Sequence, residues 1–384
     1  MFRKRRWQLA ACCLLTALLT TAAIVGTEAV LLNRLTGSAS ESVRFLRTMN
    51  LLKRNYNGEV DNRQLFDGAI KGMVEAAGDP YTVYLNSKDF QQLSEMTGGS
   101  FGGIGIVFGK RGNDYVVISA LEDNPGAKAG IKSGDIITAI DGKPTRDMNM
   151  EQVANKIRGK HGTVVKLELK GKDGKLRTVS VKRGEIKNPS VGGQLLPDTK
   201  IGYIRIAVFN ENTGDDFAKK YAELEKQGMQ ALLLDLRSNP GGVFDAGVAV
   251  AGMLVPKGPI VSVVDKNGNK YEETSSLEKV KYPLAVLVDH GSASAAEIVA
   301  GAIKDTKSGK LFGTKTFGKG SVQSVYRLDN NTAVKITVAK YYTPSGVSIH
   351  NVGIEPDVKV ELPDDATVDV QLKAAEDYLL QQLQ

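Results

Sequence analysis

Apolar runs and amphipathic stretches alternate through residues 185–362. The apolar runs have the length and aliphatic content of buried strands, and they cover residues 201–209, 231–236 and 284–288. Residues 215–227 form an amphipathic helical pattern, and residues 294–306 also predict a helix. This alternation of strands and helices predicts a layered α/β domain.

Residues 98–184 predict a separate, β-rich unit. Apolar positions 150, 153, 154 and 157 follow the i, i+3, i+4, i+7 spacing of a helix. Strands are expected on either side of it, at residues 115–119, 135–140, 165–169 and 179–181, the last two joined by a turn at Asp173-Gly174.

Residues 38–97 predict a small helical module. Apolar residues recur at three- and four-residue steps through residues 41–56, and Asp61 is a suitable N-cap for a second helix that ends at Gly78 and Pro80. A terminal helix is also expected within the tail, residues 363–384.

Residues 1–35 predict a targeting segment. A basic start is followed by an apolar run over residues 9–26, which is long for a signal peptide and just sufficient to span a bilayer. We expect an uncleaved signal-anchor, with a cleaved signal peptide as the alternative. Positive charge at the start predicts a single-pass membrane protein whose remaining residues lie on the extracytoplasmic side, or a secreted form after cleavage.

The composition limits the functional classes. At 384 residues, two or three domains are expected. The net charge is +7, but residues 3–6 supply four of these charges, and the absence of another basic block argues against nucleic acid as a partner. Cys12 and Cys13 both lie in the targeting segment, so the exported part has no disulfide, thiol nucleophile or thiolate metal site. No ligand cluster indicates a metal, and no cofactor is expected.

Ser294 occupies a position suited to a nucleophile. The stretch 291–297, Gly-Ser-Ala-Ser-Ala-Ala-Glu, joins a predicted buried strand to a predicted helix. A serine there lies beside the positive end of the helix, among unpaired N–H groups that stabilise an oxyanion. Ser294 and Glu297 also match a capping box, which requires no chemistry. The stretch alone leaves both interpretations open.

Lys319 is a candidate general base. It lies between glycines in the stretch 316–323, Thr-Phe-Gly-Lys-Gly-Ser-Val-Gln, and Gln323 would share its face if the chain is extended. Burial lowers the pKa of a lysine, and a neutral lysine can take the proton of a serine. A solvated hairpin lysine is the alternative. The glycines of Asn239-Pro240-Gly241-Gly242, which follow a buried strand, offer bare N–H groups for an oxyanion or simply a β-turn.

Residues 98–184 resemble a PDZ domain, through Pro-Gly-Ala-Lys-Ala-Gly-Ile-Lys-Ser-Gly-Asp-Ile-Ile-Thr-Ala-Ile-Asp-Gly-Lys-Pro at 125–144 and a glycine-rich start. The resemblance implies an edge groove that binds extended carboxyl-terminal peptides, with backbone N–H groups around the terminal carboxylate. The residues of that loop are Gly103, Ile104, Gly105 and Ile106.

The whole of residues 40–360 resembles the carboxyl-terminal processing proteases of peptidase family S41. The resemblance rests on Asp79-Pro80-Tyr81, the PDZ stretch, Arg237-x-Asn239-Pro240-Gly241-Gly242, the serine and lysine stretches, Tyr342-x-Pro344-Ser345-Gly346 and Gly353-Ile354-x-Pro356-Asp357. It implies a crotonase-like α/β catalytic domain over 185–362, combined with a PDZ β-sandwich-like domain over 98–184 and the helical module over 38–97.

The resemblance also assigns roles to residues. It implies Ser294 rather than Ser292 as nucleophile, Lys319 as general base and Gln323 as a supporting residue. The oxyanion hole falls on Gly242, or Gly241, and on Ala295. Asp305 matches an acidic position for which we expect a structural role.

Two other functions are compatible with parts of the sequence. A Ser-His-Asp hydrolase would use Asp289 and His290, but a base so close to Ser294 in sequence would have to bend back onto its own turn. A catalytically inactive PDZ adaptor on a protease scaffold is the second alternative, and the retained Ser294, Lys319 and Gln323 argue against it. The expected partners are protein substrates with apolar carboxyl termini, the membrane through residues 1–35, and a second copy of the chain through the amino- or carboxyl-terminal helices.

Overall fold

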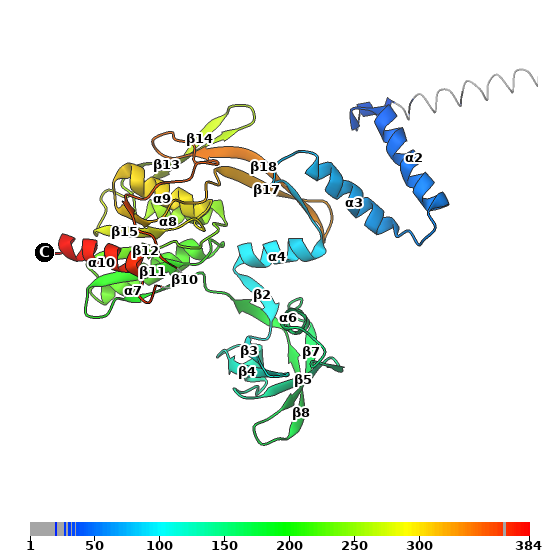
Figure 1. Cartoon of the computed structure of the whole chain (residues 1–384), viewed down its shortest axis with the longest axis horizontal. Helices are drawn as coiled ribbons and strands as arrows, with labels where there is room; N and C mark the ends of the chain where they lie inside the picture. The colour runs from blue at the N-terminus through cyan, green and yellow to red at the C-terminus, as the bar shows by residue number, and fades with distance from the viewer. Residues whose placement is uncertain (1–19, 21–26, 28–29, 32, 35, 364–365) are drawn as a thin grey trace, which may run out of the picture. The chain divides into compact units, whose positions relative to one another are not determined.

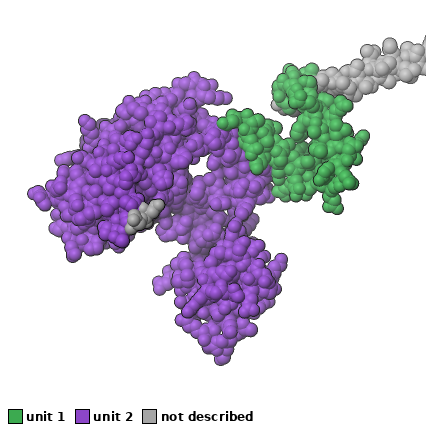
Figure 2. Space-filling view, in the orientation of Figure 1, with its two compact units in different colours: residues 1–78 green, residues 79–384 purple. Residues whose placement is uncertain are grey.

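The computed structural model describes residues 36–363 and 366–384, together with Thr20, Thr27, Val30, Leu31, Asn33 and Arg34. The predicted signal-anchor over residues 1–35 lies outside the described residues except for those six positions. None of the helices formed by described residues is long and apolar enough to cross a membrane. The chain divides into two compact units, residues 1–78 and residues 79–384 (Figure 2).

The first unit contains helices α2 (Ala39–Asn55) and α3 (Asn62–Glu75). Asp61 caps α3 as predicted, because its carboxylate accepts the N–H groups of Arg63 and Gln64 at 2.7 and 3.3 Å. Large apolar side chains of α2 are exposed, among them Val43, Phe45, Leu46, Leu51 and Leu52.

A six-stranded sheet forms the centre of the α/β domain predicted over residues 185–362 (Figure 1). All its neighbouring pairs are parallel except the first, which is antiparallel. In spatial order its strands are β10 (Val191–Leu195), β11 (Ile201–Ile206), β12 (Ala231–Asp235), β15 (Leu284–Val288), β16 (Lys310–Gly313) and β19 (Val358–Lys359).

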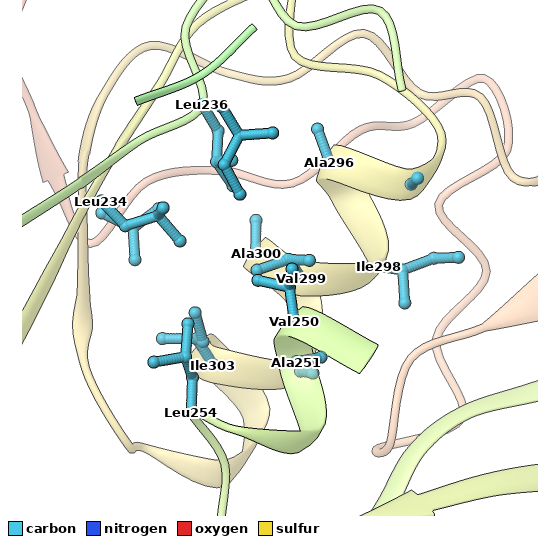
Figure 3. Close-up of a cluster of buried hydrophobic side chains, with 14 of the residues drawn as sticks. Leu234, Leu236, Val250, Ala251, Leu254, Ala296, Ile298, Val299, Ala300 and Ile303 are labelled. Atoms are coloured by element: carbon cyan, nitrogen blue, oxygen red, sulfur yellow. The ribbon is translucent and has the colours of Figure 1, made fainter. Parts of the chain in front are cut away.

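Helices cover both faces of this sheet, which explains why its central strands are apolar at every position. Leu232 and Leu234 pack against α7 (Thr213–Lys226), α8 (Phe244–Gly252) and α9 (Ala295–Thr306). The alternate residues Ala231 and Leu233 pack against α10 (Val370–Gln382) on the other face. Figure 3 shows α8 and α9 meeting through Val250, Ala251, Val299 and Ile303 beneath Leu234 and Leu236. The core therefore fixes the start of α9, where Ser294 lies.

A second, antiparallel sheet lies beside the first. Its strand order is β1-β18-β13-β14, and β17 pairs with β18. The strands are β1 (Val83–Leu85), β13 (Gly258–Asp265), β14 (Lys270–Ser275), β17 (Ser321–Arg327) and β18 (Ala333–Tyr342). The register places Lys335 of β18 opposite Val83 on one side and Val325 on the other.

The β-rich unit predicted over residues 98–184 contains a six-stranded antiparallel sheet around a core of its own. Its elements are β3 (Ile106–Arg111), β4 (Asp114–Ala120), α5 (Pro125–Lys128), β5 (Ile136–Ile140), β6 (Lys143–Pro144), α6 (Met150–Ile157), β7 (Val164–Lys170) and β8 (Leu176–Lys182). Strands β2 (Ser100–Gly103) and β9 (Gly184–Lys187) pair at the two ends of this segment and join it to the α/β domain.

The predicted helical module over 38–97 differs from the observed units. Residues 79–97 belong with the second unit, because β1 pairs with β18 and α4 (Ser87–Gly98) packs against β2. Helix α4 was not predicted, although Asn86 caps it through the N–H groups of Lys88 and Asp89.

Candidate active site

A cleft of about 670 Å³ brings together most of the predicted catalytic residues. Ser294, Lys319, Gln323, Gly241 and Gly242 all line it. Helix α4 contributes another wall through Phe90, Leu93, Ser94, Met96 and Thr97. Ala295 is buried directly behind Ser294, with only 1% of its surface exposed.

Ser294 has a strained backbone at the junction of β15 and α9. Its φ is 53° and its ψ is −117°, a region that a residue with a Cβ rarely adopts. Such strain persists only where the surroundings impose it, and it is characteristic of a nucleophile held on a sharp strand-to-helix turn. The surroundings here are Glu297, whose Oε2 accepts the N–H of Ser294 at 2.9 Å, and Tyr341, whose hydroxyl donates to the carbonyl of Ser294 at 3.1 Å.

Glu297 connects the serine turn with the lysine loop. Its fully buried carboxylate accepts four hydrogen bonds: from Ser294 N, from the hydroxyl of Thr316 at 2.6 Å, and from Gly318 N and Lys319 N at 2.7 and 2.8 Å. Burial raises the pKa of Glu297, whereas these four donors favour its ionised form. The capping-box pattern thus belongs to a larger network, which sequence spacing alone did not indicate.

Lys319 is partly withdrawn from water in the cleft. Burial, followed by the charge of Lys335, lowers the pKa of Lys319, while Glu297 and Asp79 oppose this shift. Its Nζ lies 5.0 Å from the centre of the Tyr81 ring. Within the described residues, Lys319 Nζ makes no hydrogen bond or ion pair. The environment therefore favours the neutral amine that a general base requires.

Gln323 lies in the same cleft, but its amide points along the hairpin. Nε2 donates to Ser321 Oγ at 2.9 Å, to Ser321 O at 3.1 Å and to Thr337 Oγ1 at 3.4 Å. A β-bulge between Val322 and Gln323 interrupts the regular strand alternation that would place Gln323 on the face of Lys319. The support of Lys319 by Gln323 stays a prediction.

The loop after β12 approaches Ser294 closely. A Cβ on Gly241 would lie 2.6 Å from Ser294 Cβ, and a Cβ on Gly242 would lie 1.9 Å from Phe209 O, so both positions require glycine. Asn239 fixes the loop: its Nδ2 donates to Ile206 O at 2.7 Å, and its Oδ1 accepts Gly241 N at 2.8 Å. The Gly241 N–H is thereby occupied, which favours Gly242 of the two oxyanion candidates.

The rejected candidates have structural contacts. Ser292 is fully buried, and its hydroxyl donates to Leu236 O at 2.8 Å and accepts Asp289 N at 3.0 Å. The Asp289 carboxylate accepts the N–H groups of Ser238 and Gly291, and His290 is exposed. Asp305 accepts hydrogen bonds from both the N–H and the hydroxyl of Ser345, at 2.9 and 2.6 Å. These contacts are compatible with the structural role expected for Asp305.

Arg237 anchors α10 to the sheet, a role that no local sequence pattern indicates. It bonds the buried Asp235 at 2.7 Å, Asp369 at 2.8 Å and Gln371 at 3.1 Å. Burial would lower the pKa of Arg237, but the two carboxylates hold it above its ordinary value. Burial and the charge of Asp235 raise the pKa of Tyr203 to about 12. We call Asp235, Arg237 and Asp369 the arginine clamp; it holds the strand that leads into the glycine loop.

A second cavity, of about 540 Å³, lies in the β-rich unit. Gly103, Ile104, Gly105 and Ile106 line it as the sequence predicted, together with Leu121 and Ile157. Arg158 and Phe101 also line this cavity, and the guanidinium of Arg158 lies over the Phe101 ring, 4.7 Å from its centre. The molecule thus combines a serine-and-lysine cleft with a domain that carries an apolar groove beside a glycine-rich loop, as expected of a peptide-binding serine hydrolase.

Comparison with known proteins identifies the family. The family model for peptidase family S41 matches residues 200–360, a PDZ domain model matches 116–171, and the model "Activating protease CtpB N-terminal domain" matches 27–89. Carboxy-terminal processing protease CtpA of Bacillus subtilis (strain 168) is 39% identical over 315 residues, which cover 82% of this chain and 67% of the relative. The carboxy-terminal-processing protease of Bartonella bacilliformis is 34% identical, over 90% and 81% of the two chains.

The solved structure of a photosystem II D1 C-terminal processing protease superimposes with a TM-score of 0.50 and 32% identity, over 92% of this chain and 96% of that one. The chain therefore belongs to peptidase family S41, among the carboxy-terminal processing proteases. It is a serine-type peptidase with a PDZ domain and a mixed α/β catalytic fold, and the predicted family, fold class and enzyme class are confirmed.

Proposed function

We propose that this peptidase cleaves protein substrates near their carboxyl termini with a Ser294–Lys319 dyad. The observation that carries the proposal is the strained turn of Ser294, which faces the same cleft as the partly buried Lys319 and shares the Glu297 carboxylate with the lysine loop. The names of the related proteases support the substrate class.

In the proposed first step, the neutral Lys319 amine takes the proton from Ser294 Oγ as this oxygen bonds to the carbonyl carbon of the scissile peptide. The resulting oxyanion accepts hydrogen bonds from the N–H groups of Gly242 and Ala295. The C–N bond then breaks, and the leaving amine takes the proton from the Lys319 ammonium. Water, deprotonated by Lys319, hydrolyses the acyl-enzyme and restores Ser294.

The PDZ domain captures the substrate in this proposal. An extended tail adds as a strand at the edge groove, and the backbone N–H groups of residues 103–106 hold its carboxylate. The apolar lining of the groove, which includes Ile104, Ile106 and Leu121, favours substrates with apolar carboxyl termini.

We further propose that residues 1–35 anchor the protein in the bacterial cell membrane with the catalytic part outside. The basic and apolar pattern of that segment supports this location. Accessibility of the catalytic part to added protease in intact cells tests this location, and complete protection until lysis would contradict it.

We also propose that the protein forms a homodimer through its terminal helices. The exposed apolar side chains of α2 support this proposal, and sedimentation of the detergent-solubilised protein tests it.

Cleavage of a protein with an apolar carboxyl terminus by the full-length protein tests the dyad. We expect Ser294→Ala and Lys319→Arg to abolish turnover, because arginine stays charged. Ser292→Ala is the matched control and should retain activity, since its hydroxyl only supports the fold. Equal inertness of the wild type and Ser294→Ala, with tail binding retained in both, would instead support the adaptor function.

A further inference from the structure

Lys335 faces the catalytic cleft from near the start of β18. It lies directly opposite Val325, and opposed residues of an antiparallel pair point to the same side of a sheet. Val325 and Gln323 line the cleft, and so does Lys335. Lys335 is only partly exposed and forms no ion pair with any carboxylate in the described part of the chain.

The charged groups around Lys319 come from α9, the segment ahead of β1, β18, β17 and α8. Both carboxylates that contribute to its environment are already engaged: Glu297 by four donors, and Asp79 by Tyr81 N at 3.1 Å and the Thr82 hydroxyl at 2.6 Å. Burial opposes the ionisation of Asp79, but hydrogen bonds from Thr337 and Thr82 keep its pKa below its ordinary value. Among the described residues, the titratable groups that line the cleft or lie around Lys319 are Glu297 of α9, Asp79 ahead of β1, Lys335 and Tyr341 of β18, Arg327 of β17, Asp245 of α8, and Tyr81 with His350 in edge contact.

We propose that Lys335 is a positioning residue for catalysis: its unpaired ammonium, held on the cleft face of β18, disfavours a second positive charge in the cleft and so keeps the Lys319 amine ready to accept the Ser294 proton. This inference rests on the dyad proposed above. Two like charges in a partly dehydrated cleft repel each other more strongly than they would in water, and the protonated form of Lys319 bears that cost.

A different role for Lys335 has a different kinetic signature. A lysine that gripped a substrate carboxylate would act on KM and would depend on the sequence of the substrate. A lysine that acts through Lys319 changes the pH at which the base becomes competent, whatever the substrate sequence. The distinguishing observable is therefore the acidic limb of the profile of kcat/KM against pH.

The experiment measures this profile for the full-length, detergent-solubilised protein, with a peptide substrate that contains no acidic side chain. We expect Lys335→Met to move the acidic limb upward by about one pH unit and Lys335→Glu to move it further. Lys335→Arg keeps the charge and should leave the limb in place. Lys226→Met, which removes an exposed charge at the end of α7, is the control for net charge and should change nothing.

An unmoved limb in Lys335→Met overturns the proposal, whether kcat falls, which would indicate a structural role, or KM rises, which would indicate substrate contact. If the Lys335→Met variant does not fold, the same profile is measured with Lys335→Gln, which also removes the charge. Failure of the dyad itself is separately visible: Lys319→Arg or Ser294→Ala would remain active. If both are inactive and the limb does not follow the charge at position 335, the dyad stands and only the role of Lys335 is rejected.

Discussion

The backbone N–H groups of Ser294 and Lys319 donate to the same oxygen, Oε2 of Glu297, at 2.9 and 2.8 Å. One buried carboxylate therefore sets the distance between the turn that carries the nucleophile and the loop that carries the base. Catalysis depends on that distance, because a displacement of about 1 Å can cost about 100-fold in rate.

Glu297→Gln tests this shared contact. An amide replaces one acceptor oxygen by a donor, so two of the four donors lose their acceptor and face another N–H. We expect the free energy of unfolding to fall by about 2–6 kcal/mol, since each of the two buried unpaired donors costs about 1–3 kcal/mol, and kcat to fall about 100-fold or more. Chemical denaturation and steady-state kinetics measure the two effects.

Glu223→Gln is the control for that substitution. Glu223 pairs with Lys220 at the surface of α7, and its loss should change stability by less than about 1 kcal/mol. A Glu297→Gln protein with wild-type kcat would show that the shared carboxylate does not position the catalytic groups.

The pH dependence of catalysis follows from the environment of Lys319. Burial and the charge of Lys335 lower its pKa, and only the neutral amine accepts a proton. The value of kcat/KM should therefore rise with pH through this lowered pKa and reach its plateau below about 10.4, the ordinary lysine value. An acidic limb at or above that value, in a profile measured with an uncharged peptide, would contradict the assignment of the base.

Gly241→Ala should disrupt the site directly. The new Cβ would lie 2.6 Å from both Ala293 O and Ser294 Cβ, at a φ of +89° that disfavours any side chain. We expect kcat/KM to fall about 100-fold or more, because the oxyanion loop or the serine must move. Gly346→Ala separates strain from contact: its φ is +81° but its Cβ meets nothing within 4 Å. That variant should lose only about 1–2 kcal/mol of stability and keep its activity.

Arg237→Met should break the arginine clamp. Asp235 is fully buried and would lose the guanidinium that balances its charge. Removal of one partner of a buried pair costs about 3–5 kcal/mol, so thermal or denaturant unfolding should show a loss of that size. Lys281→Met removes an exposed partner of Glu225 and should cost less than about 1 kcal/mol. Equal effects of the two substitutions would show that the clamp does not stabilise the sheet.

Local patterns predicted the elements that carry the site. The strand over residues 284–288 has the predicted bounds, and the helix from 294 differs by one residue, because its apolar face and its capping pattern are local in sequence. Asp61 also caps its helix as predicted. Gly241 of the predicted glycine loop approaches the serine closely, since a Cβ there would lie 2.6 Å from Ser294 Cβ, and the oxyanion role of Gly241 or Gly242 stays a prediction.

Local sequence patterns could not predict the long-range contacts of the site. The capping box indicated one donor for the Glu297 carboxylate, the N–H of Ser294. The other three donors belong to Thr316, Gly318 and Lys319, which lie in the loop after β16. Lys335 carries no local signal at all, since its importance depends on the pairing of β18 with β1 and β17. The bulge after Val322 turned the Gln323 amide toward Ser321, which regular alternation could not predict.

The arginine clamp also has a consequence for the order of events during synthesis. Asp369 follows Arg237 by 132 residues, so a nascent chain emerging from the ribosome exposes β12 long before the carboxylate at the start of α10 exists. Until then one apolar face of the central sheet lacks its covering helix. The catalytic domain therefore completes its fold only after α10 has been made. Until then, partly synthesised chains expose an apolar surface that is prone to aggregation.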